Sequence, residues 1–250
     1  MLTPERHRYI LHILKKNGAV SVRELAEGTA SSESTIRRDL IQLEEEGKLI
    51  RFHGGAQSLG TRAEEKTVEV RKSQHQEEKK AIGKKAAEFV EAGDCIFLDA
   101  GTTTSHMINH LPKDIIVVTN GITHVEPCIV RGITVYLLGG QIKATTRAIV
   151  GKGAFDSLRT YRFDKCFMGM NGIDLANGLT TPDPEEAHIK RIAMELSKEI
   201  FVLADASKLG TVSFSFVYPL DGLTIITSNK ADLNRLKDDQ NQTNIKVVTA

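Results

Sequence analysis

The segment Asp99-Ala100-Gly101-Thr102-Thr103-Thr104 combines residue types that suit the binding of an anion. An apolar run, Ile96-Phe97-Leu98, comes directly before it, and a predicted helix over Thr103–Leu111 follows. Glycine allows close approach to the backbone, the hydroxyls can donate, and the free amides at a helix start attract negative charge. We therefore predict a phosphate site at Gly101, Thr102, Thr103 and Thr104. The alternative is an ordinary helix capped by threonine.

Other polar loops follow strand-like runs in the same manner. They are Val118-Thr119-Asn120-Gly121, Leu138-Gly139-Gly140, Gly169-Met170-Asn171-Gly172 and Ala204-Asp205-Ala206-Ser207-Lys208. A further segment, Thr180–Glu186, opens a helix with acidic residues, some of which simple capping and the helix dipole explain. Together the loops offer amides and lysine for a phosphate, and carboxylates and amides for hydroxyl groups. This mixture is what a polyol phosphate requires.

The elements that carry these loops alternate between strand and helix. Strands are predicted over Cys95–Leu98, Ile115–Val118, Ile133–Leu138, Lys165–Met168, Ile200–Ala204 and Leu223–Thr227. Helices are predicted over Ala81–Val90, Thr103–Leu111, Thr123–Val130, Glu185–Lys198 and Ala231–Lys237, although Pro127 weakens the third of them. Such alternation predicts an α/β domain with a mostly parallel sheet covered on both faces. Ligands of these sheets bind beyond the carboxyl ends of the strands.

Residues 21–56 form a second constellation, with the order of a DNA-reading module. Ser21 and Glu24 have capping-box spacing, and Gly28 is a plausible stop for the short helix that follows. Ser31 or Ser32 caps the next helix, which runs to Gly47. A helix opening at Thr3-Pro4 comes before this module.

The second helix of the module is amphipathic and basic near its start. Its apolar stripe, Ile36, Leu40 and Leu43, faces a core, while the polar residues lie off that stripe. Arginine can bind guanine or phosphate with two hydrogen bonds. The residues predicted to contact DNA are Ser32, Ser34, Thr35, Arg37 and Arg38 in this helix, with Arg51 and His53 in a wing that ends at Gly54-Gly55. The alternative is a three-helix protein-interaction domain with solvated arginines. For Asp39 we expect an ion pair with an arginine of the same helix.

These residues resemble the winged helix-turn-helix of DeoR-family bacterial repressors over about 55 residues. The matching motifs are Ser34-Thr35-Ile36-Arg37-Arg38-Asp39-Leu40, Leu43 through Gly47, and His53-Gly54-Gly55-Ala56. The later segments D-x-G-T-T-T, V-T-N, L-G-G, G-x-x-G-I and A-D-x-S-K resemble the sensor domain of the same family, whose fold is similar to ribose-5-phosphate isomerase.

That resemblance implies a repressor of a sugar-utilisation operon whose binding to double-stranded operator DNA is modulated by a phosphorylated sugar. Gly101–Thr104 would then hold the phosphate. The candidates around the sugar are Asp99, Asn120, Asn171, Asp174, Glu186, Lys190 and Lys208. Asp205 is equally well explained by a role in the fold.

A sugar-phosphate isomerase with an attached interaction domain is the alternative function. The related isomerases carry a G-A-D-E acid cluster, because enediol chemistry needs a positioned carboxylate base. The nearest segment here is Asn171-Gly172-Ile173-Asp174, which keeps a single acid. We therefore expect no enzyme activity, no catalytic residue and no metal.

Within the family, the segments Gly178–Ala187 and Ser32–Arg38 look most like fructose-operon repressors of Gram-positive bacteria. The effector implied is fructose 1-phosphate. Tagatose 6-phosphate and fructose 6-phosphate would use the same phosphate loop, and physical grounds do not rank the three.

Composition sets wider bounds. The 250 residues carry a net charge of +1 and 40% hydrophobic residues, enough for two domains with real cores. We predict a DNA-binding domain over 1–57, a polar linker over 58–75 and a sensor domain over 76–250, with Lys79, Lys80, Lys84 and Lys85 on a solvated surface.

The cysteines and the apolar runs indicate the cellular setting of the chain. The widely spaced Cys95, Cys128 and Cys166 show no metal-ligand pattern, and Cys95 and Cys166 lie in core-like runs. No apolar run has membrane-spanning length and no signal peptide opens the chain, so we expect a reduced cytoplasmic setting.

Basic and acidic residues nearly balance in the first 57 residues. We therefore expect a homo-oligomer, a dimer or a tetramer, to present paired wings to DNA.

Overall fold

The chain divides into two compact units, Met1–Glu64 and Glu65–Ala250. The computed structural model describes residues 1–250 except 18, 53, 59–61, 237–243 and 250. Each unit has its own buried hydrophobic residues, in a single cluster in the first unit and in two clusters in the second.

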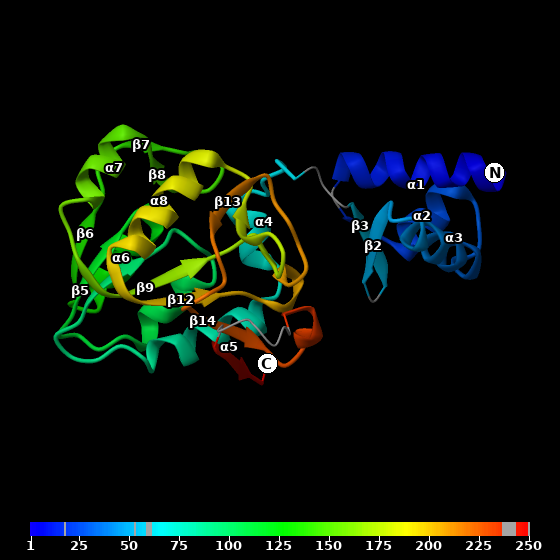
Figure 1. The fold of residues 1–250 in the computed structure, drawn as a ribbon. Coiled ribbons are helices and arrows are strands. Elements are labelled where there is room, and N and C mark those ends of the chain that lie inside the picture. The colour runs from blue at the N-terminus through cyan, green and yellow to red at the C-terminus, as the bar shows by residue number, and fades with distance from the viewer. Residues whose placement is uncertain (18, 53, 59–61, 237–243, 250) are drawn as a thin grey trace. The chain divides into compact units, whose positions relative to one another are not determined.

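The first unit consists of helices and a small antiparallel sheet with the strand order β1-β3-β2 (Figure 1). Its elements are α1 (Thr3–Asn17), β1 (Ala19–Ser21), α2 (Val22–Thr29), α3 (Glu33–Glu45), β2 (Leu49–Phe52) and β3 (Gly55–Ser58). β2 and β3 form the hairpin of a wing, so the predicted winged helix-turn-helix is confirmed.

The helix α3 is fixed in place by its apolar stripe and its two caps. Ile36, Leu40 and Leu43 are at most 1% exposed and pack with the buried residues of α1 and α2. Ser32 accepts a hydrogen bond from the Thr35 amide at 3.2 Å, as expected of an N-cap. Gly47 has a φ of 64°, which only glycine adopts at little cost, and it ends the helix as predicted.

Gly28 does not end α2, contrary to the sequence prediction. The helix continues to Thr29, and Ala30 takes the left-handed conformation with a φ of 51°. A Cβ on Gly28 would lie 2.3 Å from the Tyr9 hydroxyl, so a side chain there would clash with α1. The glycine is needed for helix packing rather than for termination.

Asp39 pairs with Arg6 of α1, and the prediction of a partner on its own helix was wrong. Both nitrogens Nε and Nη2 of Arg6 donate to the carboxylate, and His7 lies 3.2 Å from it. Burial raises the pKa of Asp39, but the hydrogen bonds from Arg6 and His7 outweigh burial and lower the pKa overall. The pair joins α1 to the inner face of α3.

The second unit is built on a parallel sheet with the strand order β15-β14-β12-β9-β4-β5-β6. The strands are β4 (Cys95–Leu98), β5 (Ile116–Thr119), β6 (Thr134–Leu137), β9 (Phe163–Gly169), β12 (Ser197–Leu203), β14 (Thr224–Ser228) and β15 (Asn244–Val248). This confirms the predicted fold class.

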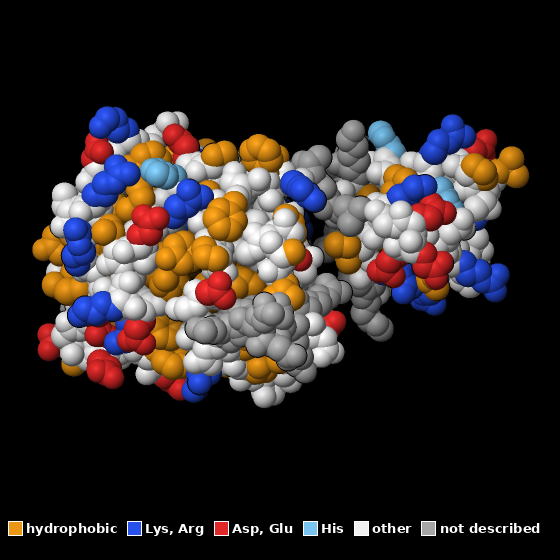
Figure 2. Space-filling model, viewed as in Figure 1, with side chains coloured by type: hydrophobic (Ala, Val, Ile, Leu, Met, Phe, Trp, Pro, Cys, Tyr) orange, Lys and Arg blue, Asp and Glu red, His pale blue; other side chains and the backbone are white. Residues whose placement is uncertain are grey.

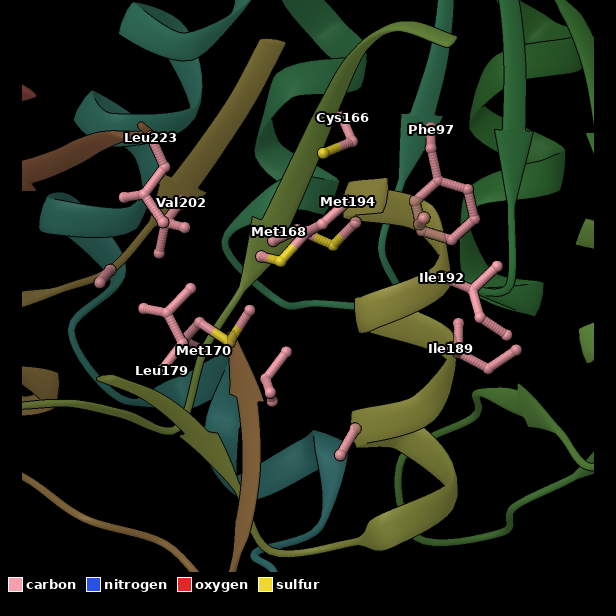
Figure 3. Close-up of a cluster of buried hydrophobic side chains, with 14 of the residues drawn as sticks. Phe97, Cys166, Met168, Met170, Leu179, Ile189, Ile192, Met194, Val202 and Leu223 are labelled. Atoms are coloured by element: carbon pink, nitrogen blue, oxygen red, sulfur yellow. The ribbon is translucent and has the colours of Figure 1, made fainter. Parts of the chain in front are cut away.

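Helices cover both faces of this sheet (Figure 1). They are α4 (Val68–Ser73), α5 (Gln76–Ala87), η1 (Thr104–His110), α6 (Ile122–Val130), α7 (Lys152–Leu158), α8 (Pro184–Glu195), η2 (Ala206–Lys208) and η3 (Leu233–Leu236). Side chains alternate along each strand, so Phe97, Met168 and Val202 pack with α8 in one cluster. Figure 3 shows Met168 and Val202 on the strands, with Ile189 and Ile192 on the facing helix.

Several elements depart from the sequence prediction. The segment after the Asp99 loop forms the 3-10 helix η1 rather than an α-helix, and Ala231–Lys237 reduces to η3 within the described residues. Pro127 lies inside α6 without ending it. The short antiparallel strands were not predicted: they are β7 (Gln141–Ile142), β8 (Ile149–Val150), β10 (Gly172–Asp174), β11 (Gly178–Thr181) and β13 (Ser215–Tyr218).

The segment expected to be a linker and a solvated helix contains packed structure. Val68 of α4 is buried, and its amide donates to the Thr145 carbonyl at 2.9 Å. Lys79 of α5 is only 4% exposed, so its assignment to a solvated surface was wrong. Lys80 and Lys84 are exposed as predicted, and Lys85 is half-buried; Lys80 pairs with Glu77 and Lys85 with Glu88.

Replacing Asp39 with Asn should destabilise the first unit by about 3–5 kcal/mol, because it leaves the buried Arg6 charge unpaired. Glu33→Gln breaks the exposed pair with Arg37 and should change stability by less than about 1 kcal/mol. Amide hydrogen exchange of the full chain, read over residues 1–58, measures both. Because the pKa of Asp39 is lowered, its stabilisation is present above about pH 4 and is lost as the pH falls through the folded pKa. Equal effects of the two substitutions would contradict this account.

Candidate functional site

A polar pocket lies in the second unit at the carboxyl ends of three neighbouring strands, β4, β9 and β12. The chain runs from β4 outward to β5 and β6, then returns to place β9 on the other side of β4. This reversal is a topological switch point, where adjacent loops diverge and leave a crevice. The fold therefore places the Asp99, Met170 and Asp205 loops around a single space.

Asp99 and Lys190 form the centre of one end of the pocket. Lys190 Nζ donates to Asp99 Oδ2 at 2.5 Å and to the Gly169 carbonyl at 2.9 Å, while the Gly169 amide donates to Asp99 at 3.1 Å. Both side chains are at most 5% exposed. These bonds fix the β4 loop, the end of β9 and the helix α8 in one arrangement.

The close contact between the β4 and β9 loops depends on two glycines. A Cβ on Gly101 would lie 2.9 Å from Thr104 Oγ1, and a Cβ on Gly169 would lie 3.3 Å from Asp99 Oδ2. Side chains at these positions would push the loops apart and disturb the Asp99 carboxylate.

Glu186 lies one turn before Lys190 on the same face of α8 and also lines the pocket. Thr146 donates to it at 2.7 Å and Lys143 at 3.0 Å. Burial raises the pKa of Glu186, but the charges of Lys190 and Lys143 and these hydrogen bonds outweigh burial and lower the pKa. With Asp99 and Asn171, the carboxylate gives this end of the pocket several acceptors for hydroxyl groups.

A second group of pocket residues, called here the basic end, carries three cations. They are Arg71 of α4, Lys79 of α5 and Lys208 of η2, and the acid that accompanies them in the lining is Asp205. Asp205 accepts from the Ser207 amide and hydroxyl at 3.1 and 2.5 Å, so it caps η2 as well. Asp205 therefore both caps η2 and lines the pocket.

Lys79 shows how strongly positive this end is. Burial, together with the charges of Lys208 and Arg71, lowers the pKa of Lys79 to about 8, although Asp205 and Glu78 oppose the change. Its ammonium donates to the Arg71 carbonyl oxygen. An anion bound here would relieve the repulsion among three cations.

Most of the predicted effector residues meet in this pocket. The ones that line it are Asp99, Gly101, Thr102, Thr103, Asn171, Glu186, Lys190 and Lys208.

Three predicted residues do not line the pocket. The Thr104 hydroxyl donates to the Asp99 carbonyl at 2.7 Å, and Asn120 accepts from the Ala100 amide at 3.0 Å, so both support the loop from beneath. Asp174 accepts from the amides of Ala176 and Asn177 in a turn after β10.

Sequence reasoning missed Arg71, Gln74, His75 and Lys79, which enter the pocket from α4 and α5. They lie in or beside the segment expected to be a linker. Thr67 followed by Val68 and Glu69 is an N-cap pattern, and its side chain does accept from the Val70 amide. That pattern predicts a helix, but it does not say that the helix packs on the sheet.

The predicted DNA-reading residues lie on the outer side of α3. Ser34, Arg37 and Arg38 are exposed, and Arg37 is bridged to Glu33 at 2.8 Å. The Ser32 hydroxyl is engaged in capping, within 2.9 Å of Ser34 and Thr35. Figure 2 shows basic and acidic side chains mixed on this unit, in agreement with its balanced charge.

The two predicted wing residues are Arg51 and His53. Arg51 pairs with Glu44 at 2.6 Å, which turns its guanidinium toward the end of α3. His53 lies outside the described residues.

Comparison with known families decides the classification. A model of the DeoR-like helix-turn-helix domain matches residues 6–62, and a model of the DeoR C-terminal sensor domain matches residues 74–230. The chain belongs to the DeoR family. It is thus a DNA-binding transcriptional regulator, and the pocket lies in its sensor domain.

Named relatives agree with this membership. The chain is 46% identical over 250 residues to the HTH-type transcriptional regulator FruR of Bacillus subtilis, covering 99% of both chains. It is 36% identical to the lactose phosphotransferase system repressor of Staphylococcus epidermidis, covering 90% of this chain and 92% of that protein. A solved ribose 5-phosphate isomerase A from Methanocaldococcus jannaschii is similar at a TM-score of 0.39, with 18% identity and 52% of each chain covered, which says nothing about activity.

Among the described residues, no helix of this DeoR-family regulator has both the length and the apolar character needed to cross a membrane.

Replacing Lys79 with Met should raise the midpoint of thermal unfolding at pH 7, because it removes a buried charge whose ionisation folding disfavours. The gain should shrink as the pH rises through about 8, where the folded wild type loses that proton and the unfolded chain keeps it. Thermal denaturation between pH 6.5 and 9 measures the change. Lys80→Met, at the exposed neighbour, should give no such gain. A lower midpoint for Lys79→Met at pH 7 would refute the electrostatic account.

Proposed function

We propose that this protein represses a sugar-utilisation operon and that a sugar phosphate bound in the sensor pocket changes its affinity for operator DNA. The observation that carries the proposal is the division of the pocket into a basic end and an end rich in acceptors. Arg71, Lys79 and Lys208 suit a phosphate group, while Asp99, Asn171 and Glu186 suit hydroxyl groups. A sugar phosphate combines the same two kinds of group, an anion and several hydroxyls.

Regulation requires the ligand to distinguish two arrangements of the protein. A sugar phosphate with equal affinity for both would leave DNA binding unchanged, so an effector that releases the protein from DNA must bind the DNA-incompetent arrangement more tightly. With near-balanced charge in the first unit, a single copy has modest affinity for DNA. A homo-oligomer, a dimer or a tetramer in the cytoplasm, would join two or more α3 helices on repeated half-sites.

Fructose 1-phosphate is the effector that we propose. The relative named FruR and the resemblance of the segment Gly178–Ala187 to fructose-operon repressors support it. Tagatose 6-phosphate and fructose 6-phosphate share the same two chemical ends and are the compounds to compare.

An isomerase function has less support from the geometry. The acid that such a reaction would use, Asp174, is occupied by a turn and lies outside the pocket lining. Two carboxylates in the pocket are paired, Asp99 with Lys190 and Glu186 with Lys143, and the third, Asp205, accepts from Ser207. A base for proton transfer needs a lone pair free to face the substrate.

Fructose 1-phosphate should release the full-length protein from the DNA upstream of its own operon. Fluorescence anisotropy of labelled DNA, titrated with protein at fixed salt, measures the affinity with and without each sugar phosphate. We expect at least a tenfold loss of affinity, about 1.4 kcal/mol of coupling, with the effector and none with fructose. If no sugar phosphate changes the affinity, the sensing role fails.

Substituting Arg38 with Ala should weaken operator binding by about 1–3 kcal/mol if the guanidinium binds a base, or lower the salt dependence by about one counterion if it binds a phosphate. Arg38 and Ser34 are both exposed in the first half of α3. The same anisotropy assay over a series of salt concentrations measures both effects. Lys152→Ala, an exposed change in the sensor domain, should leave the curve unchanged. Unaltered binding by Arg38→Ala would remove α3 from the DNA interface.

A further inference from the structure

Arg71 is a half-buried residue, and two nitrogens of its guanidinium are buried with unused hydrogen-bond donors. Among the described residues, its Nε and Nη2 atoms are shielded from solvent and have no hydrogen-bond partner. A buried guanidinium N–H without an acceptor is costly, so such groups are usually found with an anion. Arg71 lines the pocket, and the Glu65 carboxylate, whose Oε1 is also buried without a partner, lies near enough to interact electrostatically with it.

The phosphate site predicted at Gly101–Thr104 lacks a cation of its own. The Gly101 amide is already used, since it donates to the Asp99 carbonyl at 2.7 Å and to Thr104 Oγ1 at 3.0 Å. The following helix, η1, is a short 3-10 helix and offers little dipole. The nearby Lys190 is neutralised by Asp99. Three cations, Arg71, Lys79 and Lys208, line the same pocket.

Arg71 also belongs to the part of the sensor domain that joins the DNA-binding unit. The sensor unit begins at Glu65, and α4 begins three residues later. This segment is tied to the turn between β7 and β8: Glu65 accepts from Lys143 at 2.8 Å, and the Val68 amide donates to the Thr145 carbonyl. The same turn holds Glu186 of the pocket through Lys143 and Thr146.

We propose that Arg71 binds the phosphate group of the ligand through a pair of charge-assisted hydrogen bonds, and that the ligand thereby fixes α4, the first helix after the junction. The inference rests on the proposed function in taking a phosphate monoester as the ligand. Arginine suits this role because its planar fork matches two phosphate oxygens. Lys79, held against the Arg71 carbonyl, adds a second positive charge to the same subsite.

Binding at this position gives the ligand a route to the DNA-binding unit. The six residues of α4 include Arg71, whose Nε and Nη2 have no acceptor among the described residues. A phosphate that supplies the acceptor stabilises the position of α4 on the sheet. The segment that connects α4 to the DNA-binding unit is then anchored where it meets α4.

Inorganic phosphate is the probe for the first half of the proposal, because it has the anionic group without the sugar. Its dissociation constant is measured by calorimetry on the full chain, for wild type and for Arg71→Gln. We expect at least about a tenfold weaker affinity in the variant. Lys72→Gln, at the exposed neighbour on α4, is the matched control and should bind phosphate as the wild type does. Unchanged affinity in Arg71→Gln would overturn the assignment.

Hydrogen exchange of the full chain tests the second half. Saturating phosphate should slow exchange over residues 65–75 in the wild type and in Lys72→Gln, but not in Arg71→Gln. Slowed exchange confined to residues 99–104 would overturn the proposal, because the ligand would then be held by the β4 loop. Arg71→Lys keeps the charge and should weaken phosphate severalfold, which tests the fork even if Arg71→Gln does not fold.

The two proposals fail separately. If fructose 1-phosphate and the other sugar phosphates bind and slow exchange at α4 but leave operator affinity unchanged, the regulatory function is refuted and the role of Arg71 stands. If they release operator DNA equally well from wild type and Arg71→Gln, with equal affinities, the regulatory function stands and the role of Arg71 is refuted.

Discussion

The buried ion pair between Asp99 and Lys190 is the interaction on which the sensor pocket depends. It links the loop after β4, the carboxyl end of β9 and the helix α8, and both of its members also bond to the backbone of Gly169. Two ions buried in this way are tolerated only when each has further partners, which the backbone supplies here. The pair leaves the hydroxyl-binding end fixed before any ligand arrives. Because Lys190 is paired with Asp99, the cations left to bind a phosphate are Arg71, Lys79 and Lys208 of the basic end.

The basic end has a different character, because three cations lie in one pocket lining and repel one another. Arg71, Lys79 and Lys208 face one another with Asp205 as the acid in the same lining, and burial makes the protonated Lys79 costly. The buried charge of Lys79 lowers the stability of the folded protein at a place where an anion could bind, as is common at binding sites. Under the proposed function, the half fixed by Asp99 and Lys190 would select the arrangement of hydroxyl groups, and the half that contains Arg71, Lys79 and Lys208 would bind the phosphate. That contrast explains how binding could alter the protein, since a ligand changes an equilibrium only by favouring one state over another.

Much of this architecture could be predicted from the sequence. β4 was predicted with its observed limits, and the other main parallel strands except β15 to within a few residues, because runs such as Ile96-Phe97-Leu98 are apolar on both faces. Strand ends then located the loops of Asp99, Asn171 and Lys208. Pairings between distant segments could not be predicted: Arg6 with Asp39, or Arg71 and Lys79 with the sheet. These depend on tertiary packing, and a polar segment such as residues 65–76 carries no periodic signal that distinguishes a linker from a pocket wall.

The central claim is that one pocket recognises both halves of a sugar phosphate. Calorimetric titration of the full chain with fructose 1-phosphate, fructose and inorganic phosphate, under the same buffer and salt, measures it most directly. The account predicts that fructose 1-phosphate binds at least a hundredfold more tightly than either half, about 2.7 kcal/mol, and that inorganic phosphate competes with it. Equal affinity for fructose 1-phosphate and inorganic phosphate, or a lack of competition between them, would contradict it.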